Sequence, residues 1–293
     1  MSHHHHHHHA ASNIKVVFFL NLSFTLLEIV GGIWTNSVAI LSDAVHDLGD
    51  SVALGLSWYF ANVSQKKRDS HFSYGYKRFS LLGALISSFI LLVGSTLILF
   101  EAIPRLIHPE TVHVNGMILL AILGVLVNGA AVLKLRRGET QNERVVRLHL
   151  LEDVFGWFAV LIAGIVMLFV NLPVLDPILS VGITLYILWH VFKNLRETVN
   201  VFLQAIPSNM NVEQLEAMLI EKLPIQSIHD WHLWTMDGEY HVLSCHVVVA
   251  DNLPSKDIID LKTQIRELLK QYNIQHLTIE VEYENECCEL VNC

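Results

Sequence analysis

Two pairs of residues have the chemistry and the spacing of metal ligands. His46 and Asp50 lie four residues apart within one apolar stretch, and His149 and Asp153 repeat this spacing within a later one. Residues four apart share one face of an α-helix, so each stretch can aim one imidazole and one carboxylate at the same point. Two such helices facing each other would supply two nitrogen and two oxygen ligands, a set that suits tetrahedral Zn²⁺.

The setting of these four residues separates two interpretations. Ionisable side chains in the middle of a membrane span cost free energy and are seldom retained without a function. Polar residues can also be kept in spans because they hydrogen-bond to neighbouring helices, and under that interpretation the four would bind no metal. The repetition of His-x-x-x-Asp in two separate stretches favours a metal site.

The composition of the 293-residue chain indicates a membrane protein. Hydrophobic residues make up 52% of it and charged residues only 16%, which is too apolar for an ordinary soluble protein. A hydrocarbon core of about 30 Å needs roughly 20 apolar residues per helix. We therefore predict a six-helix transmembrane domain over residues 13–200, with spans at 13–34, 36–62, 79–103, 114–136, 148–171 and 176–198.

Positive charges predict the orientation of these spans. Lysines and arginines concentrate in the loop after the second span and in the loop between the fourth and the fifth: Lys66, Lys67, Arg68, Lys77, Arg78, Lys134, Arg136, Arg137, Arg144 and Arg147. Loops rich in these residues stay in the cytoplasm. Because the number of spans is even, both termini are predicted to be cytoplasmic.

Past residue 206 the sequence becomes that of a soluble domain, which we place at 207–285. Apolar periodicity predicts helices at 211–222 and 255–272 and strands at 226–236, 239–250 and 276–284. Asp237-Gly238 signals a two-residue hairpin turn between the first two strands. The order αββαβ predicts a small cytoplasmic α+β domain of the ferredoxin-like type. The acids behind the net charge of −9 concentrate after residue 211, and nothing resembles a nucleic-acid-binding surface.

The two ends of the chain carry further residues that can bind metals. His3–His9, within the tail 1–12, is predicted to be a purification tag, and a native metal-buffering tail is the alternative. Cys287, Cys288 and Cys293 crowd the tail 286–293. Without a secretory signal a disulfide framework is not expected, so these thiols are either free or part of a thiolate metal site.

Five sequence motifs are specific when they are taken together. They are Ser42-Asp43-Ala44-Val45-His46-Asp47-Leu48-Gly49-Asp50, Ser73-Tyr74-Gly75-Tyr76-Lys77-Arg78, His149-Leu150-Leu151-Glu152-Asp153, Asp176-Pro177 and His229-Asp230-Trp231-His232-Leu233-Trp234. With them the chain resembles, over nearly its whole length, the cation diffusion facilitator family of dimeric zinc–proton antiporters. The loop 138–147 lacks the long histidine-rich insertion of many animal members, so a bacterial-type exporter is expected.

The resemblance implies a homodimer in the cell (inner) membrane that exports zinc, with other divalent transition metals as further candidate substrates. The transported ion would bind His46, Asp50, His149 and Asp153 and move by alternating access. Unperturbed imidazole changes its charge at about pH 6.5, so protons would compete with zinc for the two histidines. The expected partners are zinc ions, protons, the lipid bilayer and a second copy of the chain, and no enzymatic activity is expected.

The resemblance also implies a structural or regulatory zinc ion in the cytoplasmic domain. Three positions match ligands of family members: His229, His246 and Glu282. His276 could join them. His232 and His241 are expected to be ordinary strand-surface histidines.

The loop 64–78 is expected to be a solvated basic loop. Some family members bind a further metal here through acids and histidines, and this chain has Asp69 and His71. Tyr76 stands where those members have a critical histidine, which argues against a metal in this loop.

Other polar residues lie within the predicted spans and could line an aqueous path: Asn21, Glu28, Asn128 and Asp176. Asp176 could instead begin a helix, with Pro177 in its first turn. Asp43 and Asp47 lie on other faces of the helix that carries His46. We expect them to orient the ligands or to bond between helices.

Two other classes of protein would use the same residues differently. An intramembrane metallohydrolase would need a zinc ion with an open coordination position and a general base, and the sequence has neither His-Glu-x-x-His nor an evident base. A metal sensor that is only anchored by its spans would not need the intramembrane ligands. A transporter accounts for both groups of residues.

Overall fold

A computed structural model describes residues 6–135 and 141–286 of the chain. Some helical side chains fall outside this description, among them those of residues 6–17 and of His149. The side chains of His3–His9, Cys287, Cys288 and Cys293 lie outside the described part, so the roles expected for them stay predictions. The chain divides into two compact units, one made of the chain up to Phe60 and of Gly83–Leu195, the other of Ala61–Leu82 and the chain from Arg196 onward.

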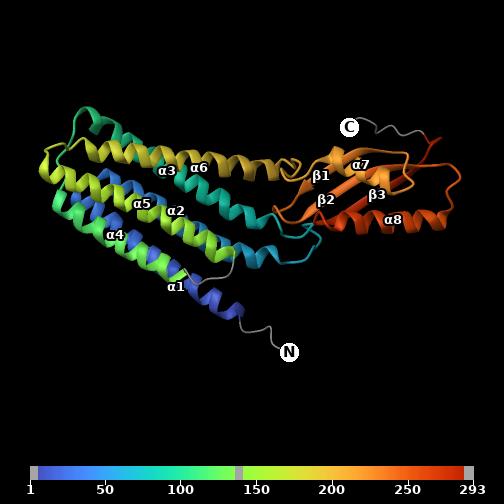
Figure 1. Ribbon diagram of the computed structural model, residues 1–293, viewed down its shortest axis with the longest axis horizontal. Coiled ribbons are helices and arrows are strands. Elements are labelled where there is room, and N and C mark those ends of the chain that lie inside the picture. Colours follow the sequence, from blue (N-terminus) through green and yellow to red (C-terminus); the bar gives the residue numbers. More distant parts are fainter. Residues whose placement is uncertain (1–5, 136–140, 287–293) are drawn as a thin grey trace. The chain divides into compact units, whose positions relative to one another are not determined.

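Six long helices follow the six apolar stretches of the sequence (Figure 1). They are α1 (His6–Thr35), α2 (Val38–Ser64), α3 (Phe79–Ile107), α4 (Val114–Leu135), α5 (Gln141–Phe169) and α6 (Leu175–Phe202). Each predicted stretch coincides with a helix to within a few residues, except that α1 begins at His6 rather than at residue 13 and α5 at Gln141 rather than at residue 148. Asn36 joins α1 to α2 with a left-handed φ of 55°, a conformation that Asn tolerates better than most residues.

Among the described residues, four helices are long and apolar enough to cross a membrane: Phe79–Ile107, Val114–Leu133, Leu150–Phe169 and Leu175–Phe202. Large apolar side chains point outward from them, for example those of Phe100 and Phe169. Such exposure is unfavourable in water and favourable in lipid. The chain therefore has a helical membrane domain.

The first two predicted spans are not among these four helices of the described part of the chain. The side chains of α1 are described mainly from Phe18 onward, so little of this helix can be assessed. α2 carries four ionisable residues that lower its apolar character: Asp43, His46, Asp47 and Asp50. Its polar residues are the ones that the sequence singles out for chemistry.

An apolar cluster around Trp157 holds α1, α2, α4 and α5 together. Its buried members are Phe24, Ala39, Ile40, Met117, Leu120, Ala121, Trp157, Val160 and Met167. Trp157 packs edge-on against Phe24, with ring centroids 5.6 Å apart. Gly124 allows this packing, because a Cβ atom there would lie 2.2 Å from the Trp157 ring. A side chain at Gly124 would force α4 and α5 apart.

The second unit contains a three-stranded sheet and two short helices. In chain order the elements are α7 (Val212–Lys222), β1 (Ser227–Thr235), β2 (His241–Val249), α8 (Ser255–Lys270) and β3 (Ile274–Tyr283), which confirms the predicted order αββαβ. β2 lies between its antiparallel partner β1 and its parallel partner β3. α8 makes the crossover that a parallel pair requires.

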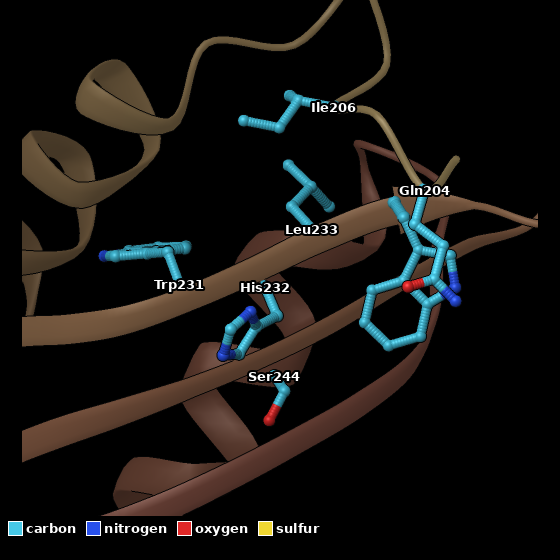
Figure 2. A pocket seen from close by; sticks show the side chains of 7 residues that line it. Gln204, Ile206, Trp231, His232, Leu233 and Ser244 are labelled. Carbon is cyan, nitrogen blue, oxygen red and sulfur yellow. The ribbon is translucent and has the colours of Figure 1, made fainter. Parts of the chain in front are cut away.

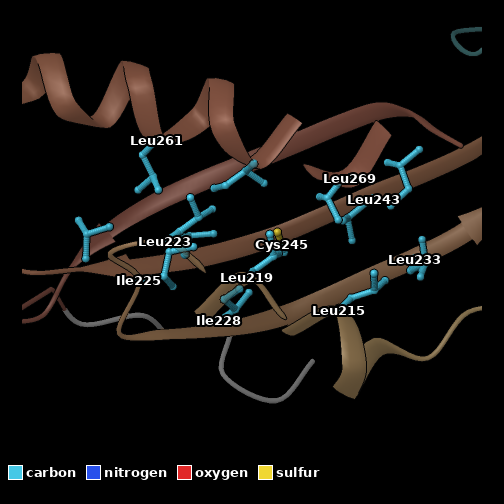
Figure 3. Close-up of a cluster of buried hydrophobic side chains, with 14 residues drawn as sticks. Leu215, Leu219, Leu223, Ile225, Ile228, Leu233, Leu243, Cys245, Leu261 and Leu269 are labelled. Atoms are coloured by element: carbon cyan, nitrogen blue, oxygen red, sulfur yellow. The ribbon is translucent and has the colours of Figure 1, made fainter. Parts of the chain in front are cut away.

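The core of this unit lies between one face of the sheet and the two helices (Figure 3). Alternate residues of β2 enter it, namely Leu243, Cys245, Val247 and Val249, together with Leu215 and Leu219 of α7 and Leu261, Ile265 and Leu269 of α8. Burial raises the pKa of the Cys245 thiol to about 12, so the thiol stays protonated and serves as a core residue. The intervening strand residues, which are more polar, point to the opposite face.

The turn between β1 and β2 is longer than the predicted two residues. Met236 N–H donates to the Tyr240 carbonyl at 2.8 Å. Asp237 Oδ1 accepts the N–H groups of Glu239 and Tyr240 at 3.0 and 2.7 Å, so the Asp237 side chain closes a wider loop. Gly238 has a left-handed φ of 94°, the conformation for which the Asp237-Gly238 pair is a turn signal.

Candidate metal centres

His46 and Asp50 face each other on α2. Nε2 of His46 lies 3.4 Å from Oδ2 of Asp50, and about a quarter of each side chain is exposed (24% and 26%). The one-turn spacing thus produces the predicted pairing of an imidazole with a carboxylate. A pair at this distance can close on an ion through small side-chain rotations.

One pocket brings residues of α2 and α5 together. It has a volume of about 550 Å³, and its wall includes His46 and Asp43 of α2 and Asp153 and Glu152 of α5. Residues of α6 complete it: Ile178, Leu179, Gly182, Ile183, Tyr186 and Ile187. Asp153 is 3% exposed. An imidazole from one helix and a carboxylate from another therefore share one cavity in apolar surroundings.

The predicted four-ligand set is only partly described. His46 and Asp153 line the pocket, and Asp50 contacts His46. His149 lies on α5 one turn before Asp153, and its side chain is outside the described part of the structure.

Asp43 and Asp47 have different surroundings, although the sequence grouped them together. Asp43 lines the pocket beside His46, so it adds a carboxylate to the cavity wall. Asp47 is fully buried, and its carboxylate oxygens have no hydrogen-bond partner among the residues that the structure describes. Asp43 is therefore the nearer of the two to the candidate ion path.

Of the polar residues predicted to line an aqueous path, two have identified partners elsewhere. Asn21 Nδ2 donates to Ser51 Oγ at 3.3 Å, which ties α1 to α2. Asp176 accepts hydrogen bonds at the start of α2, from Ser37 Oγ at 2.5 Å and from Val38 N–H at 2.8 Å. Asp176 thus caps a helix that lies far from it in sequence. Two others, Glu28 and Asn128, are buried and are not part of the pocket wall.

Three residues of the sheet converge on its polar face: His229 of β1, His246 of β2 and Glu282 of β3. Their ligand atoms all lie within 4.8 Å of one another. Nδ1 of His246 is 2.6 Å from Oε1 of Glu282, and Nε2 of His229 is 3.4 Å from Oε2 of Glu282. Two imidazoles and a carboxylate form a ligand set typical of zinc.

A β-bulge in β1 puts His229 on this face. Ile228 and Leu233 both lie in the apolar core, although residues five apart in a regular strand point to opposite faces. The register against β2 shifts between His229 and His232, and Asp230 has a left-handed φ of 51°. The extra residue lets both ends of β1 contact the core and directs His229 toward His246.

Two acids beside these three residues were missed by the sequence reasoning. Nε2 of His246 lies 3.5 Å from Asp230 Oδ2 and 3.5 Å from Glu280 Oε2. The sequence carried signals for both. Asp230 directly follows His229, and Glu280 precedes Glu282 by two residues, so both glutamates share one face of the strand.

The remaining histidines of this unit lie apart from the three ligand candidates. His276 packs against Tyr74, with ring centroids 5.2 Å apart, and six strand residues, roughly 20 Å, separate it from Glu282. His232 is at the surface as expected and pairs with Asp230 at 3.0 Å. His241 was predicted at the surface and is buried instead, because it begins β2 on the core side. Burial lowers the pKa of His241, so its imidazole is neutral at neutral pH.

A second pocket lies beside the bulge, within the same unit (Figure 2). It has a volume of about 360 Å³, and its lining comes from β1, from Ser244 of β2 and from the segment after α6: Gln204, Ile206, Trp231, His232, Leu233, Trp234 and Ser244. Of these residues only His232 is a strong metal ligand. This pocket therefore does not supply a ligand set.

The loop after α2 uses its acid for its own hydrogen bonds. Asp69 Oδ2 accepts the Tyr76 hydroxyl at 2.7 Å, and Oδ1 accepts the N–H groups of Phe72 and His71. These hydrogen bonds lower the pKa of Asp69, and the bond from the Tyr76 hydroxyl has the largest effect. Both carboxylate oxygens are engaged, which favours the solvated loop over a metal site.

Comparisons with known proteins extend over almost the whole chain. Residues 14–203 match the family model for the cation efflux transmembrane domain. Residues 207–284 match the model for the cytoplasmic domain of cation efflux proteins. The chain belongs to the cation diffusion facilitator family.

Members of this family from bacteria are similar to the chain along most of their length. The cadmium, cobalt and zinc/H(+)-K(+) antiporter of Bacillus velezensis is 34% identical over 92% of this chain and 89% of its own length. The zinc transporter ZitB of Pectobacterium atrosepticum is 32% identical over 100% of this chain and 91% of its own length. The ZitB protein of Escherichia coli is 31% identical over 91% of this chain and 86% of its own length. Cation diffusion facilitators are membrane transporters, so the chain is a transporter and not an enzyme, and the metallohydrolase interpretation is wrong.

Proposed function

We propose that this chain exports Zn²⁺ from the cytoplasm in exchange for protons, by alternating access through a site of His46, Asp50, His149 and Asp153. One observation carries the proposal: His46 and Asp153, from two different helices, line a single pocket among apolar helices. Carboxylates in such surroundings are costly unless they are neutralised. A divalent cation would balance the two aspartates, which gives a reason for their presence.

The ligand types favour zinc over harder ions. Imidazole and carboxylate both bind Zn²⁺ at about 2.0 to 2.2 Å, whereas Mn²⁺ prefers oxygen ligands. The names of the relatives support this choice, because two are named zinc transporters and the third adds cadmium and cobalt. We therefore propose zinc as the main substrate and cadmium and cobalt as further candidates.

Protons would compete with zinc for His46 and His149. Zinc binds only deprotonated imidazole, so on the cytoplasmic side the ion would displace protons and bind the two histidines with Asp50 and Asp153. When the site opens to the outside, protonation of one or both histidines would release zinc, and the protons would return inward. The proton gradient would thus drive export.

We further propose six spans, α1 to α6, in the cell (inner) membrane, with both termini in the cytoplasm. α1 and α2 have 30 and 27 residues, which corresponds to at least about 40 Å of helix. The basic loops support the orientation, as with Lys66, Lys67 and Arg68 after α2. Residues 13–200 would form the transmembrane domain, flanked by the histidine-rich tail or tag at 1–12.

The cytoplasmic domain is proposed to be ferredoxin-like, to extend over 207–285 before the cysteine tail 286–293, and to hold a structural or regulatory zinc ion through His229, His246 and Glu282. Ligands around a tetrahedral zinc lie roughly 3.4 Å from one another. The atoms of these three residues lie within 4.8 Å, so small side-chain rotations would suffice. The family model for this region is that of a dimerisation domain, which supports a homodimer.

Zinc uptake by proteoliposomes tests the proposed function. Vesicles with an acidic lumen should accumulate zinc when they contain the wild-type protein, and a protonophore should abolish the accumulation. Asp153→Asn keeps the size of the side chain and removes its charge, so vesicles with this variant should take up no more zinc than empty ones. Equal uptake by wild-type and empty vesicles would contradict the proposal.

A further inference from the structure

Three polar ties join α2 to α6 at intervals of one helical turn. Asp176 accepts hydrogen bonds from Ser37 Oγ at 2.5 Å, Val38 N–H at 2.8 Å and Ala39 N–H at 3.4 Å. Ser180 Oγ donates to the Val38 carbonyl at 3.2 Å. The hydroxyl groups of Ser42 and Thr184 are 2.7 Å apart. The side chains of Asp176, Ser180, Ser42 and Thr184 are all buried.

These hydrogen bonds follow one another along α2 in the direction of the proposed ion ligands. Val38, Ser42, His46 and Asp50 follow one another at four-residue intervals, so they form one stripe along α2. On α6, Gly182 and Ile183 precede Thr184 and line the pocket that contains His46. The bond between Ser42 and Thr184 therefore lies one turn before His46, at the edge of the pocket.

Apolar side chains also pack around the start of this stripe. Val38 packs in a cluster with Ile98 and Ala102, with Leu41, Val45 and Val181 around it. Apolar side chains surrounded by lipid gain little from one rotational setting over another, whereas hydrogen bonds between helices are directional. Among the hydrogen bonds described above between α2 and α6, the one between Ser42 and Thr184 is nearest in sequence to His46.

We propose that Ser42 and Thr184 are positioning residues for the transported ion. Their hydrogen bond fixes the rotation of α2 against α6 and so aims His46, which contacts Asp50, into the pocket, while Asp176 anchors the start of the helix. This inference rests on the proposed function, since it assumes that His46 and Asp50 bind the ion. It predicts that loss of the bond weakens ion binding and loosens discrimination between zinc and larger ions.

Thr184→Val tests the inference, because it removes the hydroxyl and keeps the shape. Initial rates of zinc uptake into proteoliposomes, measured over a range of zinc concentrations, should show a KM about 3- to 10-fold higher. The maximal rate per inserted protein should stay within about twofold, and the ratio of cadmium to zinc uptake should rise. Ser42→Ala should have the same effect, and the double variant should be no worse than either single one.

Two further variants separate positioning from simple folding. Thr184→Ser retains the hydroxyl and should restore the wild-type KM. Thr96→Val is the matched control, because Thr96 Oγ1 donates only within α3, to the Leu92 carbonyl at 2.7 Å, and it should leave KM and the cadmium-to-zinc ratio unchanged. A Thr184→Val protein with wild-type KM, or with only a lower maximal rate, would overturn the inference while the proposed function stands. Absence of zinc uptake by the wild-type protein would overturn both.

Discussion

Nδ1 of His246 lies 2.6 Å from Oε1 of Glu282, although the parallel register pairs His246 with Glu280. Glu282 lies two positions further along β3, on the same strand face. Its side chain therefore reaches back toward the imidazole, and Glu280 approaches the other ring nitrogen at 3.5 Å. With Asp230, which lies 3.5 Å from the same nitrogen as Glu280, three carboxylates converge on one histidine, an arrangement that a bound cation would balance.

Zinc should stabilise the cytoplasmic domain. Expressed from Pro207 onward, the domain keeps the core between the sheet and its helices, and a metal that binds only the folded state raises stability by mass action. At a zinc concentration 100 times the dissociation constant the gain is about 2.7 kcal/mol. Thermal unfolding with zinc and with chelator would measure it as a rise in Tm.

Glu282→Gln should abolish most of this rise, because it removes the carboxylate that both histidines contact. His232→Ala is the control, since His232 lies on β1 with His229 and its imidazole is exposed. It should retain the rise. An equal rise in the wild type and in Glu282→Gln would remove Glu282 from the metal site.

The stability of the same domain should fall with acid partly through His241. Burial lowers the pKa of this imidazole in the folded state, so its contribution is present above the ordinary pKa of about 6.5 and is lost as the pH falls below it. Urea unfolding at pH 7.5 and 5.5, in the presence of chelator, would measure the loss. His241→Gln cannot titrate and should show a smaller difference between the two pH values. Identical differences would show that His241 does not contribute.

Replacing either proposed aspartate ligand should abolish zinc transport. Asp50→Ala and Asp153→Ala each remove one of four ligands and leave the apolar packing around Trp157 intact. Proteoliposome uptake should fall to background, while size-exclusion chromatography in detergent shows an unchanged dimer. Glu101→Gln, an exposed carboxylate on α3, serves as the control. Wild-type uptake by a verified Asp50→Ala preparation would disprove the assignment.

His46→Asp should change selectivity more than rate. The substitution replaces an imidazole with a hard oxygen ligand and adds a negative charge, which disfavours manganese less. The smaller carboxylate also loosens a site that holds a small tetrahedral ion tightly, so the larger cadmium ion should enter more easily. We expect zinc as the main substrate of the wild type, little manganese uptake, and a gain in cadmium uptake by the variant. All three ions would be compared at one fixed pH. If wild-type protein already moves cadmium as fast as zinc, His46 does not determine selectivity.

Local patterns sufficed to predict most of the architecture. Apolar runs marked the helices, and Asn211 at a helix start caps α7, where its Oδ1 accepts the Gln214 N–H at 3.0 Å. The pairing of His46 with Asp50 also followed from spacing alone, because a helix fixes that geometry. The convergence of His229, His246 and Glu282 came from family resemblance and not from spacing.

Features that depend on contacts between residues far apart in the chain could not be predicted from the sequence. Asp176 and the α2 residue Val38 are 138 positions apart, so no local pattern links a cap to its helix. The bulge at Asp230 becomes evident only once Ile228 and Leu233 are both known to be in the core. His241 looked like a surface residue because its burial depends on which face of β2 the helices cover.

Simultaneous measurement of zinc and proton movement tests the central claim most directly. Proteoliposomes that hold a zinc indicator and a pH indicator would receive external zinc without an imposed pH gradient. For the wild-type protein we predict zinc entry accompanied by alkalinisation of the lumen, as protons leave in exchange. Both signals should be absent with His46→Ala. Zinc entry without a pH change in the wild type, or unchanged proton exchange in His46→Ala, would contradict zinc–proton antiport through this site.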